Sequence, residues 1–595
     1  MAIQLTPQQQ EAVLYDGHLL IVAGPGSGKT STTVAKGTRV LRDPARSLIM
    51  VTFTKEAAEE MRKRLDASIL ASKLRPPDES RLVVATFHSI AIRHLKRYGL
   101  KTRVLSPAAQ NMLYRDAVLA AGVDKNEWGD VQKEFERFMY SVDQESVVLS
   151  LDVTRAVIKR YRALLKATGQ IDLYTVMRDC ALKVHDGTLP PLPYTDLLVD
   201  EGQDADDLQL LWIFAHAKAG CRVTIVADDD QSIYEWRNAL GYEGMRSFLD
   251  KFHAHRIELG DNFRCRAEIL GRAALLISHN DKRLSKHLVA RRGKGGAIAA
   301  FRGAGSDDQN RVLADVIEAV PEQHTNVAIL ARTNRSLDLL EIVLRGRGIA
   351  YTRLGKSIWD DHGIAGYVGL LQTLLDGSPS GLLPALQLLN VSDEVRSDLL
   401  VALGGNATTF LDGAIPPMDS LDGTDKKALA GLARDFSYWR RQLRAAASPL
   451  SGSVREVILE VGEQYASWTH NKQGKLLVEL CSRILADLKG TLSSRLNFIS
   501  RRDREVRAAV VLMTMHGAKG LEFATVHVID ANNNDDGSAI VRPDAERRLM
   551  YVAMTRAKNC CVLWHSGDMH PALRESQVVF KQTKEELVQL MRAAA

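Results

Sequence analysis

One short segment constrains the fold of this chain more than any other. Residues 23–30 read Ala-Gly-Pro-Gly-Ser-Gly-Lys-Thr and directly follow the apolar run 19–22. The segment follows the pattern Gly-x-x-x-x-Gly-Lys-Thr with Ala23 in the place of the first glycine. Placed between a strand and a helix, this pattern forms a loop whose backbone N–H groups point at phosphate oxygens. The sequence therefore predicts a nucleoside triphosphate site at the end of a buried strand.

The residue types of this loop suit that task. Glycine allows a tight bend and a close approach of the backbone to the phosphates, because no Cβ stands in the way. The Lys29 ammonium would reach the β- and γ-phosphates, and the Thr30 hydroxyl would ligate Mg²⁺. An ordinary glycine-rich turn is the alternative, but strand, loop, Lys-Thr and a helix-compatible segment follow one another in the required order. The loop residues predicted to bind nucleotide are Gly24, Pro25, Gly26, Ser27, Gly28, Lys29 and Thr30.

Length and composition bound the class of protein. A chain of 595 residues is too long for one hydrophobic core and indicates about four domain-sized units. The 78 basic and 72 acidic residues nearly balance, so any nucleic-acid surface would be local. Six scattered cysteines, without metal-ligand spacing, suit a reducing compartment. We expect no signal peptide and no membrane contact, and therefore a cytoplasmic, nucleoid-associated protein.

Short apolar runs alternate with helical patterns along much of the chain. This alternation is typical of doubly wound parallel sheets, which bind ligands at the carboxyl ends of their strands. A helix is expected over 56–65, and another near 583–591. The expected strands are 19–23, 48–53, 82–85, 197–199, 223–227, 327–331, 510–513, 526–529 and 560–564.

Two mostly helical stretches interrupt this rhythm and lie between strand-rich segments. The simplest arrangement is an α/β fold with two parallel-sheet cores, each carrying a helical insertion. The predicted first core is 1–90 and 191–262, with its insertion at 91–190. The predicted second core is 263–375 and 505–575, with its insertion at 376–504 and a short tail at 576–595.

A second predicted strand ends in two carboxylates, Asp200 and Glu201. In an NTPase, the first carboxylate of such a pair holds the Mg²⁺ shell, and the second orients and deprotonates the attacking water. Acidic pairs are also common at exposed strand ends, so this interpretation depends on the phosphate loop upstream. We predict Thr30 and Asp200 as metal ligands and Glu201 as a catalytic residue.

Another strand leads into Asp228-Asp229-Asp230-Gln231, followed by Tyr234, Trp236 and Arg237. The Gln231 amide is suited to sense the γ-phosphate. Two aromatic side chains beside a cation suit stacking on unpaired bases, at about 1–3 kcal/mol per base. Inward packing of the aromatics in a half-buried turn is the alternative, and the neighbouring Gln231 favours the functional interpretation.

Further motifs follow in a fixed order. They are Leu5-Thr6-Pro7-Gln8-Gln9, Val51-Thr52-Phe53-Thr54, Thr86-Phe87-His88-Ser89, Asp200-Glu201-Gly202-Gln203-Asp204, Asp261-Asn262-Phe263-Arg264, Ala331-Arg332-Thr333-Asn334, residues 514–523 and residues 547–557. With the phosphate loop and residues 231–237, this series resembles superfamily 1A DNA helicases of the UvrD/Rep/PcrA type. The resemblance covers nearly the whole chain and implies two RecA-like motor domains of the P-loop NTPase fold.

The resemblance also implies roles at the nucleotide site. Gln9 would read the adenine, Phe263 would stack on it and Glu522 would contact the ribose. Arg39 is also predicted to contact the nucleotide. Arg264 would touch the γ-phosphate, and Arg556 would be the arginine finger. Both arginines would bring positive charge to the phosphoryl-transfer transition state from the second core. The predicted catalytic residues are Lys29, Asp200, Glu201, Gln231, Arg264 and Arg556.

By the same resemblance, loops of both cores would hold DNA. The residues predicted to contact DNA are Phe53, Thr54, Thr86, Phe87, His88, Tyr234, Trp236, Arg237, Arg332, Asn334, Thr514 and His516. A basic stretch at 81–103, without acidic residues, suits a grip on the phosphate backbone. The second basic cluster, Lys282-Arg283 to Lys294, is expected to be solvated surface or a duplex contact. Gly202 departs from the bulky apolar residue usual in the family.

We therefore predict an ATP-dependent DNA helicase with Mg²⁺ as cofactor, moving 3′→5′ on single-stranded DNA and unwinding duplex DNA in repair, replication or recombination. It would act as a monomer or a DNA-assembled dimer, with repair or replication proteins as possible partners. Two alternatives stay open: a translocase that displaces proteins from DNA, and a DNA-sensing ATPase subunit of a repair or defence complex. RNA as the track is a weaker alternative.

Overall fold

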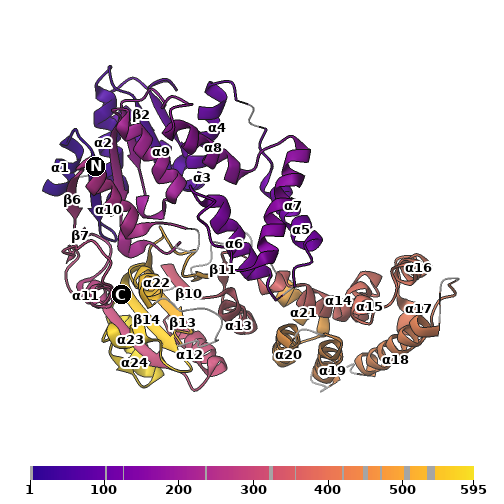
Figure 1. Ribbon diagram of the computed structural model, residues 1–595. Helices are drawn as coiled ribbons and strands as arrows, with labels where there is room; N and C mark the ends of the chain where they lie inside the picture. Colours follow the sequence, from indigo (N-terminus) through magenta and orange to yellow (C-terminus); the bar gives the residue numbers. More distant parts are fainter. Residues whose placement is uncertain are drawn as a thin grey trace. The chain divides into compact units, whose positions relative to one another are not determined.

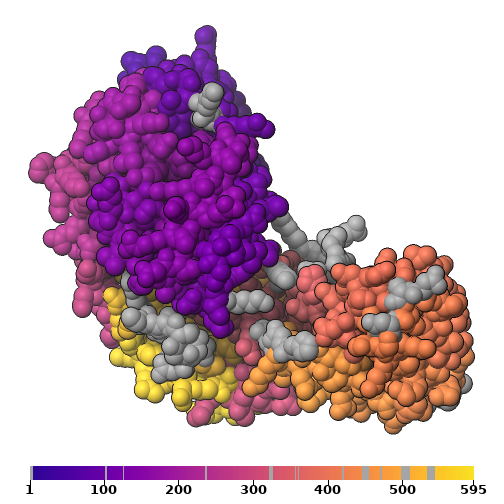
Figure 2. Space-filling model, turned by 45° about the vertical axis from the view of Figure 1, so that its right-hand side comes forward, coloured from indigo at the N-terminus to yellow at the C-terminus, as the bar shows by residue number. Residues whose placement is uncertain are grey.

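The chain forms two compact units in a computed structural model (Figure 1). The structure describes residues 5–100, 103–124, 126–234, 238–320, 326–355, 357–418, 421, 423–445, 453–469, 472–500, 510–532 and 543–594. The first unit is Met1–Gly296 with Asp536–Thr555, and the second is Ala297–Asp535 with Arg556–Ala595. Figure 2 shows the side-chain surface of the same chain. No helix among the described residues is both long and apolar enough to cross a membrane.

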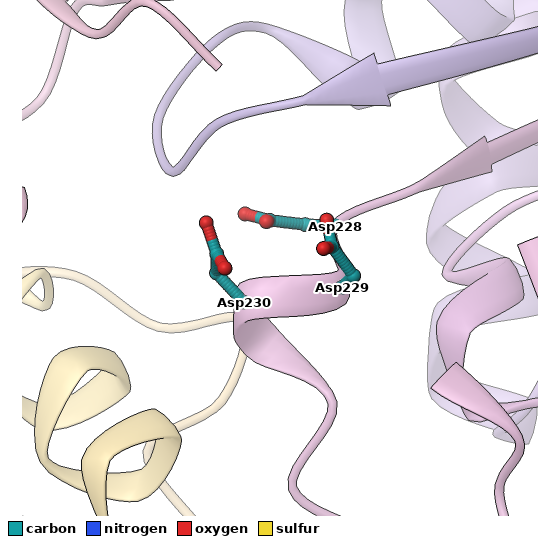
Figure 3. Close-up of side chains that lie close together, drawn as sticks. All are labelled: Asp228, Asp229 and Asp230. Carbon is teal, nitrogen blue, oxygen red and sulfur yellow. The ribbon is translucent and has the colours of Figure 1, made fainter. Parts of the chain in front are cut away.

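The first unit is built on a six-stranded parallel sheet. Its order is β3-β2-β4-β5-β1-β6, so β1 lies between β5 and β6. Every residue of β1 and β2 is buried, as expected for parallel strands covered on both faces by helices. The strands are β1 Leu19–Ala23, β2 Leu48–Thr52, β3 Leu82–Thr86, β4 Asp196–Val199, β5 Arg222–Ala227 and β6 His255–Leu259. The chain leaves β5 into three consecutive aspartates (Figure 3).

Helices cover this sheet and extend from it. Those near the sheet are α1 Pro7–Leu14, α2 Lys29–Arg42, α3 Lys55–Ala71, α4 Phe87–Arg97, α8 Leu173–His185, α9 Asp207–Lys218 and α10 Gly241–Phe252. A separate apolar cluster around Phe135 and Tyr161 joins α5 Pro107–Ala120, α6 Trp128–Tyr140 and α7 Asp152–Thr168. The unit also holds β7 Asp261–Asn262, α11 Ala267–Ile277, β8 Val289–Ala290 and α22 Pro543–Met554.

The second unit contains a seven-stranded parallel sheet of order β11-β12-β10-β13-β14-β9-β15. The strands are β9 Ala297–Arg302, β10 Val327–Ala331, β11 Tyr351–Arg353, β12 Val510–Thr514, β13 Phe523–Ile529, β14 Ala557–His565 and β15 Phe580–Lys581. The helices beside them are α12 Ser306–Ala319, α13 Asn334–Gly346, α23 Pro571–Glu575 and α24 Lys584–Ala593.

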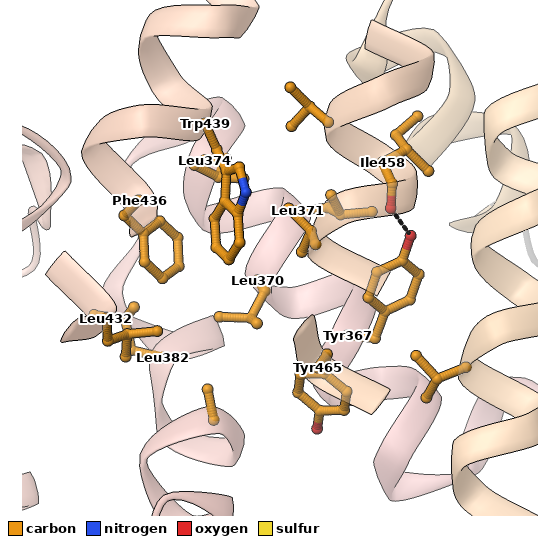
Figure 4. Close-up of a cluster of buried hydrophobic side chains, with 14 of the residues drawn as sticks. Tyr367, Leu370, Leu371, Leu374, Leu382, Leu432, Phe436, Trp439, Ile458 and Tyr465 are labelled. Atoms are coloured by element: carbon orange, nitrogen blue, oxygen red, sulfur yellow. Dashed lines mark hydrogen bonds between the residues drawn. The ribbon is translucent and has the colours of Figure 1, made fainter. Parts of the chain in front are cut away.

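A helical region follows β11 in the second unit. It comprises α14 His362–Asp376, α15 Leu382–Leu388, α16 Asp393–Leu403, α17 Thr408–Leu411, α18 Gly423–Ala445, α19 Ser453–Trp468, α20 Lys472–Asp487 and α21 Leu492–Ser500. Its core is almost wholly apolar, with Phe436 and Trp439 of α18 near Leu374 of α14 (Figure 4). The buried Tyr367 hydroxyl donates to the Ile458 carbonyl at 2.9 Å, which satisfies its polar group inside this core.

The two parallel sheets confirm the predicted fold class. Both predicted helical stretches are helical where the structure describes them, although the second begins earlier, at α14. The division into compact units differs from the predicted domain boundaries in two places. Residues 263–296 and α22 belong to the first unit, because α11 packs on α22 and α22 packs on the short 3-10 helix Asp229–Gln231.

Candidate functional site

The phosphate loop joins β1 to α2 in a conformation that requires glycine. Gly26 and Gly28 have φ angles of +61° and +77°, in the left-handed region that side chains disfavour. A Cβ on Gly26 would lie 2.6 Å from Cβ of Arg264, and one on Gly28 would lie 2.6 Å from Nε2 of Gln9. The loop is therefore enclosed by neighbouring residues and leaves no room for larger side chains.

Lys29 begins α2 with its ammonium buried and its hydrogen-bonding capacity unused. Its side chain is 12% exposed, and Nζ has no hydrogen-bond partner; Glu201 Oε1 lies 3.8 Å away. The Ser27 hydroxyl is also buried without a partner. Buried donors left unsatisfied are costly unless something completes them. Phosphate oxygens in the loop would supply these acceptors, so the residues present fit a nucleotide.

The acidic pair lies at the carboxyl end of β4. The Asp200 N–H donates to the Val51 carbonyl, which continues the sheet pairing, and the Glu201 N–H donates to Asp200 Oδ1 at 3.1 Å. Glu201 has a φ of +52°, a strained conformation for a residue with a Cβ. This turn directs its carboxylate toward Lys29. The structure thus brings together the two motifs that the sequence placed at separate strand ends.

Gln203 connects the acidic pair to the next strand end. It is fully buried; its Nε2 donates to Glu201 Oε2 at 2.5 Å, and its Oε1 accepts from the Asp228 N–H at 2.9 Å. Gln203 lies within a motif recognised in the sequence, but no role was predicted for its side chain. Its place two residues after the predicted base was the available signal.

Gln231 closes the same network. It ends the short 3-10 helix Asp229–Gln231, is buried, and donates from Nε2 to Asp228 Oδ2 at 2.5 Å. Asp228 therefore joins Gln231 to Gln203, and through Gln203 to Glu201. The predicted water-activating residue and the predicted γ-phosphate sensor belong to one hydrogen-bonded system.

The side of the loop facing α1 offers a place for a base. Gln9 Oε1 accepts from the Thr6 N–H, and Gln9 Nε2 donates to the Ser27 carbonyl at 2.9 Å. A cavity of about 470 Å³ opens beside these residues, between α1 and β6. The Phe263 N–H donates to the Gly26 carbonyl, and Phe263 is 47% exposed. An exposed aromatic side chain held next to the loop fits the predicted stacking role.

Two other predicted nucleotide contacts, Arg264 and Arg39, lie outside the phosphate loop. Arg264 is a correction: it was predicted to belong to the second core, but it lies in the first unit, where it donates to the Thr555 carbonyl at 3.2 Å. Arg39 is a correction: it lies in the last turn of α2 and forms a bidentate pair with Asp16, at 2.8 and 2.6 Å. A helix rises about 1.5 Å per residue, so Arg39 is about 15 Å along α2 from Lys29.

Two further nucleotide contacts belong to the second unit. Glu522 pairs with Lys558 at 2.6 Å, and Arg556 is buried with Nη1 near the Leu521 carbonyl at 3.4 Å. Their roles toward a nucleotide stay predictions.

Predicted DNA contacts of the first unit cluster after β2 and β3. Thr54 and Thr86 cap α3 and α4 by accepting from backbone N–H groups at 3.1 and 3.4 Å. Phe87 is a correction: it is 3% exposed and packs between Phe53 and Trp212, so it belongs to the core. The Nε2 of His88 is buried without a partner, and burial lowers the pKa of this side chain.

The aromatic motif after Gln231 is only partly visible. Tyr234 is half-buried, while Trp236 and Arg237 lie outside the described residues. Their predicted contacts with DNA stay predictions.

In the second unit, four predicted DNA contacts lie at neighbouring strand ends. Arg332 and Asn334 follow β10 and are exposed; Thr514 ends the adjacent β12, and His516 follows it half-buried. Arg353, at the end of β11, donates to Asn334 Oδ1 at 3.1 Å and was missed by sequence reasoning. Nothing in its local sequence distinguishes it from other arginines.

The cluster 282–294 was expected to be solvated or to contact duplex DNA, and the structure divides it. Lys282 is solvated as expected: its side chain is 70% exposed and forms an ion pair with Glu243. Lys286 is a correction: its side chain is fully buried among aspartates. The structure also explains why glycine, rather than a bulky apolar residue, occupies position 202: a Cβ there would overlap Ile225 of β5.

A parallel sheet with a glycine-rich phosphate loop, a buried lysine and an acidic pair on a neighbouring strand end defines a P-loop NTPase. Residues 5–253 match the UvrD/REP helicase N-terminal domain family, and residues 473–566 match the UvrD-like helicase C-terminal domain family. The chain belongs to the UvrD/Rep/PcrA type of helicase.

Relatives align over most of their length. The ATP-dependent DNA helicase PcrA of Leuconostoc citreum is 28% identical over 625 aligned positions, covering 92% of this chain and 80% of that protein. DNA helicase II of Escherichia coli is 26% identical, covering 93% of this chain and 83% of that protein. The ATP-dependent DNA helicase Rep of Escherichia coli is 26% identical, covering 93% and 90%.

Proposed function

We propose that this protein is an ATP-dependent DNA helicase that moves 3′→5′ along single-stranded DNA and separates duplexes during DNA repair or replication. The observation that carries the proposal is the buried, unsatisfied Lys29 ammonium beside Glu201, at the mouth of a glycine-requiring loop. Membership of the helicase family, along with relatives named as ATP-dependent DNA helicases, supports DNA as the track.

The residues of the first unit would perform the hydrolysis. Lys29 and the loop N–H groups hold the phosphates, and Thr30 and Asp200 would hold Mg²⁺, which neutralises phosphate charge. Glu201 orients the attacking water and takes its proton. Gln203 holds the Glu201 carboxylate in place through its short hydrogen bond, so the base is positioned before the nucleotide arrives.

Arg264 and Arg556 would add positive charge where the transition state is most negative. Arg264 belongs to the first compact unit and Arg556 to the second. Arg332, Asn334, Thr514 and His516 would hold the strand in the second unit, as would Phe53, Thr54, Thr86 and His88 in the first.

The deciding experiment measures ATP hydrolysis and strand separation on duplexes with a 3′ tail, a 5′ tail or blunt ends. We expect hydrolysis stimulated by single strands and unwinding only of the 3′-tailed duplex. Unwinding from the 5′ tail would contradict the polarity. Stimulated hydrolysis without unwinding, combined with displacement of a protein bound to the strand, would identify a translocase instead.

A further inference from the structure

A buried ionic cluster lies directly behind Gln231. Asp228, Asp229 and Asp230 follow β5, are at most 2% exposed, and direct their carboxylates toward a common space (Figure 3). Three buried carboxylates so close together repel one another unless positive charge lies between them. No role was predicted for these aspartates from the sequence, except that they lead into Gln231.

The positive charge comes from the segment 283–286, between α11 and β8. The Lys286 side chain is fully buried; its Nζ donates to Asp228 Oδ1 at 2.8 Å and to Asp229 Oδ1, and lies 2.9 Å from Asp230 Oδ2. Arg283 binds Asp230 through two hydrogen bonds, at 3.0 and 2.7 Å. The Lys286 ammonium thus fills the place between the carboxylates that a metal ion would need.

The electrostatics keep this lysine charged. Burial alone would lower the pKa of Lys286, but the three aspartates raise it well above its usual value. Burial would raise the pKa of Asp230, whereas Lys286 and Arg283 lower it below the ordinary range. Asp228 therefore faces a permanent cation on one of its oxygens.

The other oxygen of Asp228 leads to the nucleotide site. Asp228 Oδ2 accepts from Gln231 Nε2 at 2.5 Å. The backbone N–H of Asp228 donates to Gln203 Oε1 at 2.9 Å. Gln203 Nε2 in turn donates to Glu201 Oε2 at 2.5 Å. A continuous chain of polar contacts thus runs from Lys286 through Asp228 to both Gln231 and Glu201.

We propose that Lys286 is a positioning residue of the ATPase: its ammonium fixes the turn at Asp228, so that Gln231 and Glu201 stay aimed at the nucleotide. This inference rests on the proposed function, and it makes hydrolysis depend on the segment 283–286. Without the ammonium, Asp228 would turn away from Asp229 and Asp230, and Gln231 would lose its hydrogen bond to Asp228. The ion pairs of the Lys286 ammonium are with Asp228, Asp229 and Asp230, so we expect nucleotide binding to depend on it little.

The test compares Lys286→Met with Lys282→Met, a matched change at the exposed lysine four residues earlier. We expect Lys286→Met to lower kcat of DNA-stimulated ATP hydrolysis on the order of 10- to 100-fold, as for displaced catalytic groups. The Kd for a fluorescent ATP analogue should change less than about twofold, within the scatter of unrelated sites. Turnover in Lys286→Met equal to that of Lys282→Met overturns the inference.

A double variant separates positioning from charge balance. Asp229→Asn with Lys286→Met restores the net charge of the cluster but not the contact between the ammonium and Asp228. We expect it to unfold at a higher urea concentration than Lys286→Met while kcat stays low; full recovery of kcat overturns the positioning role. Absence of ATP hydrolysis in the unmodified protein would instead contradict the proposed function.

Discussion

The two parallel sheets end differently at their carboxyl edges. In the first unit, Gln203, Asp228 and Gln231 are buried and hydrogen-bonded to one another behind the phosphate loop. In the second unit, Arg332 and Asn334 are exposed at the equivalent edge. The same architecture therefore produces a preorganised polar interior in one unit and a reachable polar surface in the other.

This difference matches two physical tasks. Phosphoryl transfer needs groups held in place before the reaction, because reorganising them would raise the barrier. Contacts to a strand read without regard to sequence need charges that a phosphate backbone can reach as it passes. Under the proposed function, the first edge would carry out the chemistry, and the second would add exposed contacts to the DNA strand.

Each unit also contains a buried, hydrogen-bonded histidine away from these edges. His216 in α9 accepts the Leu192 N–H on Nε2 and lies 2.8 Å from the Trp212 carbonyl through Nδ1. In the second sheet, His527 accepts the Trp564 indole N–H at 3.2 Å. Burial lowers the pKa of His216 to about 4 and that of His527 to about 3, so both are neutral at neutral pH.

Lys29→Ala would break the first edge and gives the largest expected effect. We expect ATP hydrolysis to fall by about 10²- to 10³-fold or more, because the transition state loses a preorganised charge. Binding to single-stranded DNA, measured by fluorescence anisotropy, should be largely retained, because Lys29 is not one of the residues proposed to contact DNA. Lys63→Ala, a change at an exposed lysine of α3, is the control. Normal turnover in Lys29→Ala would refute the site.

Acid pH should weaken the first unit through His216. Burial lowers the pKa of His216 in the folded protein to about 4, below its value of 6.5 in the unfolded chain. The unfolded chain therefore binds a proton first, and the free energy of unfolding falls by about 3 kcal/mol as pH drops from 6.5 to about 4. Urea unfolding at a series of pH values should show this loss, and His216→Gln should flatten it. His527→Gln is the matched variant in the second unit, with a window reaching about pH 3. Equal slopes in variant and parent would contradict the assignment.

Arg332→Ala tests whether the second edge contacts DNA, and its expected effect is the smallest of the three. We expect single-stranded DNA binding to weaken by about 1 kcal/mol, and the slope of log affinity against log salt to shrink by about 0.7, as for one lost phosphate contact. Arg311→Ala, at an arginine of α12 that pairs with Asp308 and is largely exposed, is the control. An unchanged salt slope would remove Arg332 from the DNA surface.

The sequence predicted the apolar strands well, including β3 at a sheet edge, and missed strands rich in polar residues or alanine. β1 and β10 have the predicted bounds, because their residues are apolar on both faces. β6 was missed: it lies at the edge of its sheet and reads His-Arg-Ile-Glu-Leu. β9 was missed because three of its six residues are alanine, which carries little strand propensity.

Site residues divide in the same way. The sequence by itself determined the phosphate loop, the acidic pair and Gln231, since each depends on residue types at fixed spacing after a strand. Phe87, Arg39 and Lys286 needed the tertiary structure. Local sequence does not say whether an aromatic side chain or a charge is buried; that depends on which distant segment packs against it. Only the fold placed Lys286 against three aspartates more than fifty residues away, because burial is a property of the whole chain.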